Sequence, residues 1–585
     1  MITDTILVGY LRDFSDDFGY MKLDEPKQFE KFVNNIIFSR QYMRSNPTPE
    51  LIDIVSTGNG QDTGFDGIGI IVNGVLIKNM DEYKFFSEKD FNLDISFIFI
   101  QSKARSRFSA SEVENFYFGV DNFFNEKSSI PENENIKKIR EIKNFIYKND
   151  TLKFNKNPNV YMYYVAAGEW KEPKDIVARK DKCIQKLKEK NIFSDIRAIF
   201  YDTEKLKVLY KELKRKNIKK IQFSNRVSLP DITNVTQSFI GSLPMNEFLK
   251  IITDSEDNLQ GNLFDDNVRH FQGNNKVNKE IENTLKTKDI QDALPILNNG
   301  ITIIAKKIEQ TGNNISLFDF QIVNGCQSAH VLFRNKEIID DNTNIIVKII
   351  ETTNQSLINT IIKATNRQTQ VTDEAFESLS EFHRNLEMYY EAKSKQIENP
   401  IYYERRSKQY DNDPRKIKST QIITLAGQIQ SYVATFLEQP HSTHRYYGEL
   451  LNSNRSRLFI EKYKKYEEYY FSALILNRLD LLFRNKKLDK KFRDYKLQIL
   501  YIAFLYFKEL MEKSKNSKEN KVSYDKIFLE HLNNIDDLEK IFHLAIDVIN
   551  MELKKLPNNE KNEAFRLNKF TEMIKENIEN QFSKP

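Results

Sequence analysis

Cysteine is scarce in this sequence, and long apolar runs are absent. The 585 residues include only two cysteines, Cys183 and Cys326, which lie far apart and belong to no cluster of zinc-ligand residues. This scarcity argues against a disulfide framework or a structural zinc site. The longest apolar stretch, residues 499–507, is too short to span a bilayer, and the N-terminus lacks the basic-then-apolar order of a signal peptide. The sequence therefore predicts a soluble, cytoplasmic protein with no membrane partner.

The familiar signatures of several enzyme classes are missing as well. We find no phosphate-binding Walker loop, no dinucleotide-binding fingerprint, no nucleophilic triad and no internal repeat of solenoid length. What is abundant is apolar and aromatic side chain, with 40% hydrophobic residues, 42 Phe and 27 Tyr. A chain of this length and composition can fill several cores, so we expect about three or four domains.

Positive and negative charges also nearly balance over the whole chain. The formal net charge is only +5, so a nucleic-acid surface would have to come from a local cluster. Residues 171–220 contain 17 Lys and Arg against 8 Asp and Glu. Two interpretations of this cluster stay open: solvated helix faces, or a surface that contacts phosphates.

The first 200 residues predict the order helix, three strands, helix, strand. Apolar residues recur at helical spacing after Glu25-Pro26. Three strand-like runs follow at 67–72, 75–78 and 95–101, and Asn73-Gly74 joins the first two as a tight hairpin turn. Ser109 and Glu112 are spaced as a capping box for a helix that reaches about residue 124. Further along we expect a helix at 136–147, a strand at 159–167, a helix at 176–189 and a strand at 196–201.

Polar residues at the ends of two of these strands indicate a catalytic site. Asp66 stands among glycines where the first strand begins, and the apolar strand 95–101 ends in Gln101-Ser102-Lys103. Strand alternation places Gln101 and Lys103 on one face. Magnesium takes oxygen ligands from one or two carboxylates, waters and a substrate phosphate. We therefore expect Asp66 and Gln101 to bind Mg²⁺, with Mn²⁺ as a substitute, and Lys103 to orient and help deprotonate the attacking water.

A second acid is needed to restore the negative charge that Gln101 lacks. Glu30 supplies it if its helix packs beside the strands, although Glu25 or Asp53 could serve instead. This arrangement resembles the PD-(D/E)xK superfamily, in particular its Mrr-like branch, where glutamine commonly replaces the second acid. The resemblance implies a restriction-endonuclease-like fold and a Mg²⁺-dependent endonuclease with Asp66, Gln101, Lys103 and Glu30 as the catalytic set.

Residues 260–450 carry polar residues at many element ends. The segments Leu297-Asn298-Asn299-Gly300, Val323-Asn324-Gly325-Cys326-Gln327 and Ala364-Thr365-Asn366-Arg367 resemble the AIPR family, named for abortive-infection phage resistance. The similarity extends from about residue 235 to about residue 448. It implies a prokaryotic defence protein, and it assigns no chemistry to this region.

A strand, a glycine turn and a helix start at residues 323–328 could hold an anion on backbone N–H groups. The alternative is that these polar side chains only cap and pin turns. As a group they predict a ligand pocket formed by Asn267, Arg269, Asn298, Asn299, Asn324, Gln327, Asn366, Arg367 and Arg405.

The resulting prediction is an α/β multidomain protein. It has a PD-(D/E)xK nuclease-like domain at 1–230, a central α/β AIPR domain at 231–450 and an α-helical region at 451–585. We expect an abortive-infection effector that hydrolyses phosphodiester bonds of nucleic acid, DNA in preference to RNA, under control of the AIPR domain. A phage-derived or nucleotide trigger and a homodimer are the expected partners. The alternative is a catalytically silent regulator that binds nucleic acid or nucleotide through the AIPR domain.

Overall fold

The computed structural model divides the chain into two compact units. One comprises residues 1–15 and 23–372, and the other comprises residues 16–22 and 373–585. The structure describes all residues except 1, 42–46, 59–62, 89–92, 215–217, 255–256, 258, 265–275, 341, 367–379, 406–408, 411–412, 516–530 and 583–585.

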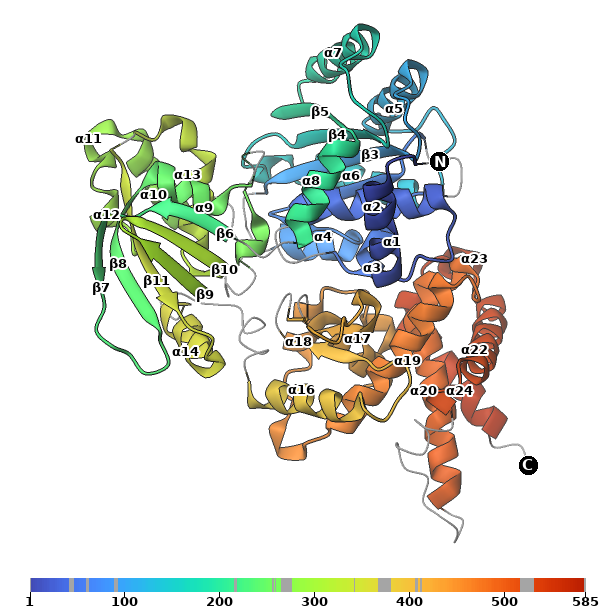
Figure 1. The fold of residues 1–585 in the computed structure, drawn as a ribbon. Coiled ribbons are helices and arrows are strands. Elements are labelled where there is room, and N and C mark those ends of the chain that lie inside the picture. Colours follow the sequence, from blue (N-terminus) through green and yellow to red (C-terminus); the bar gives the residue numbers. More distant parts are fainter. Residues whose placement is uncertain are drawn as a thin grey trace. The chain divides into compact units, whose positions relative to one another are not determined.

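The first unit contains a five-stranded sheet in the N-terminal part of the chain (Figure 1). Its order is β2-β1-β3-β4-β5. Strand β1 is antiparallel to β2 and β3, whereas β3, β4 and β5 are parallel. The strands are β1 (Gly67–Val72), β2 (Val75–Leu76), β3 (Ile95–Lys103), β4 (Asn159–Ala166) and β5 (Asp195–Tyr201).

Helices cover both faces of this sheet. They are α1 (Thr5–Asp17), α2 (Glu25–Gln41), α3 (Pro49–Val55), α4 (Met80–Ser87), α5 (Ala110–Phe123), α6 (Glu134–Asn149), α7 (Lys174–Glu189) and α8 (Thr203–Lys214). On one face, Phe99 of β3 packs against Phe123 of α5, with ring centroids 5.2 Å apart. On the other face, a Cβ at Gly67 would overlap the Asn34 side chain of α2, so this glycine lets the helix approach β1 closely.

A second, six-stranded sheet completes this unit, in the order β6-β10-β9-β11-β8-β7. Only β9 and β11 are parallel. The strands are β6 (Ile218–Gln222), β7 (Asn225–Ser228), β8 (Gln237–Pro244), β9 (Ile301–Thr311), β10 (Asn314–Asn324) and β11 (Asn344–Glu351). The accompanying helices are α9 (Met245–Ile252), α10 (Lys276–Lys286), α11 (Lys288–Gln291), α12 (Leu294–Leu297), α13 (Cys326–Arg334) and α14 (Gln355–Asn366).

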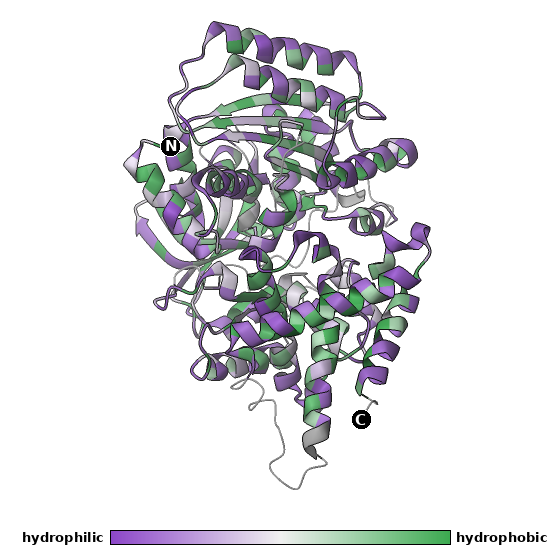
Figure 2. Cartoon of the chain, turned by 90° about the vertical axis from the view of Figure 1, so that its right-hand side faces the viewer, coloured by the Kyte–Doolittle hydropathy of each residue, from purple (hydrophilic) through white to green (hydrophobic). Residues whose placement is uncertain are grey.

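The second unit is almost wholly helical around one continuous apolar core that extends from Phe382 to Ile578. Two short parallel strands, β12 (Tyr402–Glu404) and β13 (Ile422–Thr424), are its only sheet among the described residues. The main helices are α16 (Glu381–Lys393), α17 (Leu425–Thr435), α18 (Tyr447–Ser453), α19 (Tyr466–Arg484), α20 (Lys496–Lys515), α22 (Ile535–Lys555), α23 (Asn558–Lys561) and α24 (Asn568–Phe582). Figure 2 shows green, hydrophobic stretches on these helices alternating with purple, hydrophilic ones, as expected of amphipathic helices that bury one side.

Most elements agree with the sequence analysis, and the α/β multidomain class is confirmed. The Asn73-Gly74 turn is present, with φ of 50° and 76°, and it joins β1 to β2 with Val72 opposite Val75. Helix α5 begins at the expected place, but the capping box does not form, because Ser109 makes no side-chain cap bond and Glu112 pairs with Arg105 instead.

The second sheet and the second apolar core each include residues from both sides of a domain limit that the sequence analysis expected. Strands β6 and β7 precede residue 230 but belong to the second sheet. The boundary expected at residue 450 falls inside the apolar core of the second unit. Within the described residues, no helix is both long enough and apolar enough to cross a membrane.

Candidate active site at the ends of β1 and β3

The register of β1 and β3 brings Asp66 beside Gln101. Gly67 lies opposite Ile100 in this antiparallel pair, and the N–H of Asp66 donates to the carbonyl of Ile100 over 2.8 Å. Asp66, which precedes Gly67, therefore lies opposite Gln101, which follows Ile100. Two of the predicted site residues, 35 positions apart in sequence, are thus in direct contact.

The Asp66 carboxylate is buried and held by hydrogen bonds from β3. Its Oδ2 accepts from the backbone N–H of Ser102 at 2.7 Å, from the Ser102 hydroxyl at 3.3 Å, and from Nε2 of Gln101. Its backbone carbonyl accepts from Nδ2 of Asn34 at 3.1 Å. Such a network fixes the position of the carboxylate before any ligand arrives, as a catalytic acid requires.

Glu30, on α2, is the second acid of the site. Burial raises the pKa of its carboxyl group from 4.5 to about 7, and the negative charge of Asp66 adds to this rise. The Lys27 ammonium opposes it by donating to both Glu30 oxygens, at 2.7 and 2.9 Å. Two acids that repel each other in a buried place form a site that a cation would stabilise.

The other two acids that the sequence left open have different partners. Oε1 of Glu25 accepts from the N–H of Ile2 at 3.0 Å, and Asp53 forms an ion pair with Lys31 at 2.8 Å. Neither contributes to the raised pKa of Glu30, whereas Asp66 does. The structure therefore favours Glu30 over Glu25 and Asp53.

Lys103 is the last residue of β3 and is half-buried. Its side chain makes no hydrogen bond or ion pair with any residue that the structure describes. Most buried or half-buried lysines in this part of the chain are paired, as Lys27 and Lys31 are. An ammonium group that no described side chain engages can bind a phosphate oxygen or a water molecule.

The donor set fits a hard divalent cation. Asp66 and Glu30 offer carboxylate oxygens, and Gln101 is buried next to Asp66. Gln101 now turns Nε2 toward the carboxylate, so a ligand role would require its amide to rotate and present Oε1. No group of three or more His, Cys, Asp or Glu side chains suited to a metal occurs in the described part of the chain, so any site here rests on two acids and one amide.

Three residues of this site escaped the sequence analysis. Lys27 and Asn34 lie three and four positions from Glu30 on α2, a helical spacing that could have revealed both. Ser102 had no such signal, because strand alternation points it away from Gln101 and Lys103. The glycine that we expected to admit a ligand, Gly67, instead makes room for Asn34.

The raised pKa of Glu30 gives a prediction about stability. Without divalent metal, the unfolded chain ionises this group near pH 4.5 and the folded chain near pH 7. Ionisation of Glu30 therefore costs no free energy of unfolding below about pH 4.5, and it lowers the free energy of unfolding as the pH rises toward 7. Glu30→Gln removes this loss, so we expect it to raise the free energy of unfolding in EDTA by about 2–3 kcal/mol near pH 8, and by far less near pH 5.

Denaturant titration at the two pH values measures this effect. Glu134→Gln is a matched control, because the Glu134 side chain is 78% exposed, and it should give no pH-dependent difference. A Glu30→Gln protein that is less stable than wild type near pH 8 would show that the ionised Glu30 carboxylate does not destabilise the folded protein.

Several cations of the basic cluster at residues 171–220 form ion pairs. Lys186 and Lys190 both contact Asp121, at 2.7 and 3.1 Å, and Arg179 pairs with Glu114. Lys207 lies 3.0 Å from Asp4. These ion pairs lower the net positive charge of the surface and support the interpretation as solvated helix faces.

The polar residues predicted to form a ligand pocket in the central region are mostly engaged within the fold. Asn298 donates to the Ser328 hydroxyl at 3.0 Å and accepts from the N–H of Gly300 at 2.9 Å. Asn324 donates to the carbonyl of Thr365 at 3.1 Å. Gln327 accepts from Asn278 at 2.9 Å. These contacts favour the alternative that the side chains pin turns.

The remaining members of that predicted pocket do not add a shared site. Asn299 is exposed. Arg405 belongs to the second unit, where its Nε donates to Glu387 at 2.8 Å. Asn267, Arg269, Arg367 and the side chain of Asn366 lie outside the described residues. The strand, glycine turn and helix start are confirmed, with Gly325 at φ 96° just before α13.

Comparisons with known proteins identify the larger part of the chain. No curated protein and no solved structure matches it. A family model described as AIPR protein matches residues 264–561, about half of the chain, and so extends past the end near residue 448 that the sequence analysis expected. The match supports a role in abortive-infection defence against phage. The chain belongs to the AIPR protein family.

Proposed function

We propose that this protein is an anti-phage effector whose N-terminal part is a Mg²⁺-dependent endonuclease of the PD-(D/E)xK type. The observation that carries the proposal is the presence of two buried acids, Asp66 and Glu30, with Asp66 held by hydrogen bonds from Gln101 and Ser102 of β3. Lys103 ends the same strand. The sequence order of helix, three strands, helix and parallel strand around this pair supports the proposal, because it is the core order of that fold.

In this proposal, Asp66, Glu30 and Gln101, once its amide has rotated, would hold a magnesium ion. When bound, Mg²⁺ supplies a Lewis acid for the phosphate and lowers the pKa of a water molecule. Ser102 and Asn34 fix Asp66 through the hydrogen bonds described above. Lys27 keeps Glu30 in place until the ion arrives.

Lys103 acts on the substrate. Its ammonium group attracts the phosphate, orients the attacking water and stabilises the negative charge that develops on the phosphoryl oxygens. Water adds its oxygen to phosphorus, the bond to the leaving oxygen breaks, and the proton passes to solvent or to that oxygen.

Cleavage assays with the full-length protein test the proposal. We expect supercoiled plasmid DNA to be nicked or linearised with Mg²⁺ or Mn²⁺, and to stay intact in EDTA. A structured RNA of similar mass, assayed in parallel, tests the expected preference for DNA. If neither substrate is cut with either metal over a range of protein concentrations, the catalytically silent regulator becomes the better description.

Duplex cleavage by a single-site nuclease is easiest in a dimer, since each strand needs its own active centre, and two-fold assemblies are the commonest. We therefore include a homodimer in the proposed function. Light scattering during size-exclusion chromatography measures it directly.

A further inference from the structure

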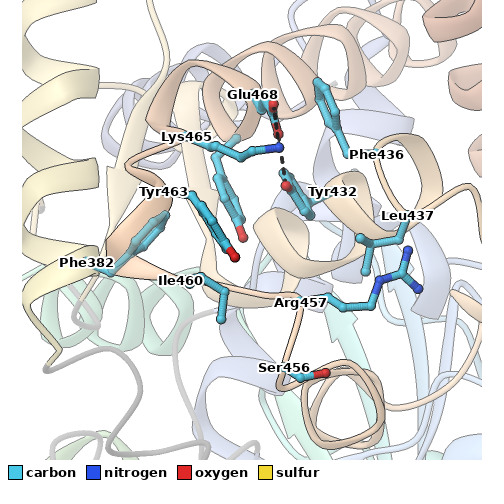
Figure 3. Close-up of a pocket in the computed structure, with 11 residues that line it drawn as sticks. Phe382, Tyr432, Phe436, Leu437, Ser456, Arg457, Ile460, Tyr463, Lys465 and Glu468 are labelled. Atoms are coloured by element: carbon cyan, nitrogen blue, oxygen red, sulfur yellow. Dashed lines mark hydrogen bonds and ion pairs between the residues drawn. The ribbon is translucent and has the colours of Figure 1, made fainter.

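A cavity in the second unit is lined by residues that belong to a different unit from those of the proposed nuclease site. It has a volume of about 360 Å³ and is lined by side chains of α16, α17, α19 and the segment 456–465 (Figure 3). All of these residues fall within the part of the chain that matches the AIPR family. The volume is at the lower end of the range for small-molecule sites, roughly 300–1,000 Å³.

Aromatic rings form much of the cavity lining. Tyr432 and Tyr469 are stacked, with centroids 3.9 Å apart and planes at 6°. Phe382 meets Tyr469 edge to face at 5.1 Å. In contrast, Tyr463 lines the same cavity but is 62% exposed, and Figure 3 shows its ring projecting between Phe382 and Ile460. An exposed ring at the mouth of an aromatic cavity can stack on a planar ligand.

The charges around the cavity favour an anion. Glu468 is the acid of the lining, and it is engaged by Lys465 at 3.0 Å and by the Tyr432 hydroxyl at 3.0 Å. Arg457, which also lines the cavity, makes no side-chain hydrogen bond or ion pair with the described residues. Because Lys465 and Glu468 neutralise each other, the guanidinium of Arg457 leaves the cavity with one net positive charge.

The segment that carries Arg457 and Tyr463 is held in an unusual backbone conformation. Phe459 and Lys464 have φ of 54° and 45°, a region that bulky side chains rarely adopt. The N–H of Phe459 donates to the hydroxyl of Tyr469, which lines the cavity, at 2.7 Å. This hydrogen bond holds the segment against the cavity. Backbone strain of this kind concentrates at ligand sites, and here it fixes the place of the ring and the guanidinium.

We infer that this cavity binds a single nucleoside phosphate. The base stacks on Tyr463, as bases do on exposed aromatic side chains in other nucleotide-binding proteins. The phosphate pairs with Arg457, whose planar guanidinium matches phosphate oxygens in a bidentate manner. The volume admits one nucleotide unit rather than a longer strand. The inference concerns a ligand of the AIPR region and does not depend on the nuclease proposal.

Calorimetric titration of the full-length protein tests the inference. The probes are AMP, GMP, CMP and UMP, with inorganic phosphate and a single-stranded trinucleotide for comparison, all in EDTA so that metal at the N-terminal site cannot contribute. We expect at least one monophosphate to bind once per chain, more tightly than inorganic phosphate. Tyr463→Ala and Arg457→Ala should each weaken this binding about tenfold to a hundredfold.

Two variants separate the ligand contacts from damage to the fold. Tyr463→Phe keeps the ring and should keep the affinity. Lys462→Ala removes an exposed cation of the same segment that does not line the cavity, and it should bind as wild type does. The inference is overturned if no monophosphate binds saturably, if inorganic phosphate or only the trinucleotide binds best, or if Tyr463→Ala and Arg457→Ala leave the affinity unchanged.

Discussion

Lys103→Ala should lower the rate of phosphodiester cleavage by about a hundredfold to ten-thousandfold, the contribution of one positioned catalytic side chain. The fold should survive, because the Lys103 side chain has no hydrogen bond or ion pair with the described residues to lose. Initial rates on plasmid DNA at saturating Mg²⁺ measure the effect. Lys103→Arg keeps the positive charge that attracts phosphate but carries it on a planar guanidinium, so it tests whether the compact ammonium group is needed.

Arg105→Ala is the matched control for Lys103→Ala. Arg105 lies two residues further along, is about half exposed and pairs with Glu112, so its loss removes a nearby positive charge without touching the site. We expect the control to cleave at the wild-type rate. Equal activity in Lys103→Ala and wild type would remove this lysine from the catalytic set.

The second large effect concerns defence itself. In a bacterial host challenged with phage, the wild-type protein should protect the culture, and Asp66→Asn should give no more protection than an empty vector. The variant removes a negative charge from the cation site while leaving an oxygen that can accept the hydrogen bond from Ser102. Asp66→Asn is therefore a gentler change than Asp66→Ala, which would leave three buried donors without their acceptor.

Asp53→Asn is the control for the phage experiment. Asp53 is also a buried acid, and it forms an ion pair with Lys31 of α2. It should protect as wild type does when the proteins are expressed at equal levels. Full protection by Asp66→Asn would show that defence does not require phosphodiester cleavage, and it would favour a regulator acting through the AIPR region.

The parts of the fold that were predictable are those with short-range signals. Alternating apolar residues and the Asn73-Gly74 turn determine β1, β2 and their register, and that register brings Asp66 to Gln101. The polar end of β3 was recognisable in the sequence, because Gln101 and Lys103 lie on one face of an otherwise apolar strand. Strand β3 and helix α2 were therefore predicted close to their observed bounds.

Other features depend on tertiary contacts that no local pattern reveals. Helix α3, absent from the predicted order, begins at a Thr48 cap and contributes Ser56 and Thr57 to the surroundings of Asp66. The capping box at Ser109 failed because Glu112 also accepts a hydrogen bond from Tyr164 of β4, at 3.3 Å. The choice among three acids required the packing of α2 on the sheet.

The cavity in the second unit could not be predicted from the sequence for a different reason. Its rings come from segments up to 87 residues apart, from Phe382 to Tyr469, and in sequence they resemble ordinary core positions of amphipathic helices. Conversely, Asn298 and Asn324, which are conspicuous in the sequence, already form hydrogen bonds within the fold. Residue type alone does not separate a side chain that supports the fold from one that awaits a ligand, because the difference lies in whether its partners are already present.

The most direct test of the nuclease account is the cleavage rate of purified full-length protein as a function of Mg²⁺ concentration, for wild type and Asp66→Asn side by side. We expect the wild-type rate to rise from zero in EDTA to a plateau, as the Asp66 and Glu30 site fills, and the Asp66→Asn rate to stay at background at every concentration. Metal-dependent cleavage that is equal in the two proteins would place the active centre elsewhere and contradict the account.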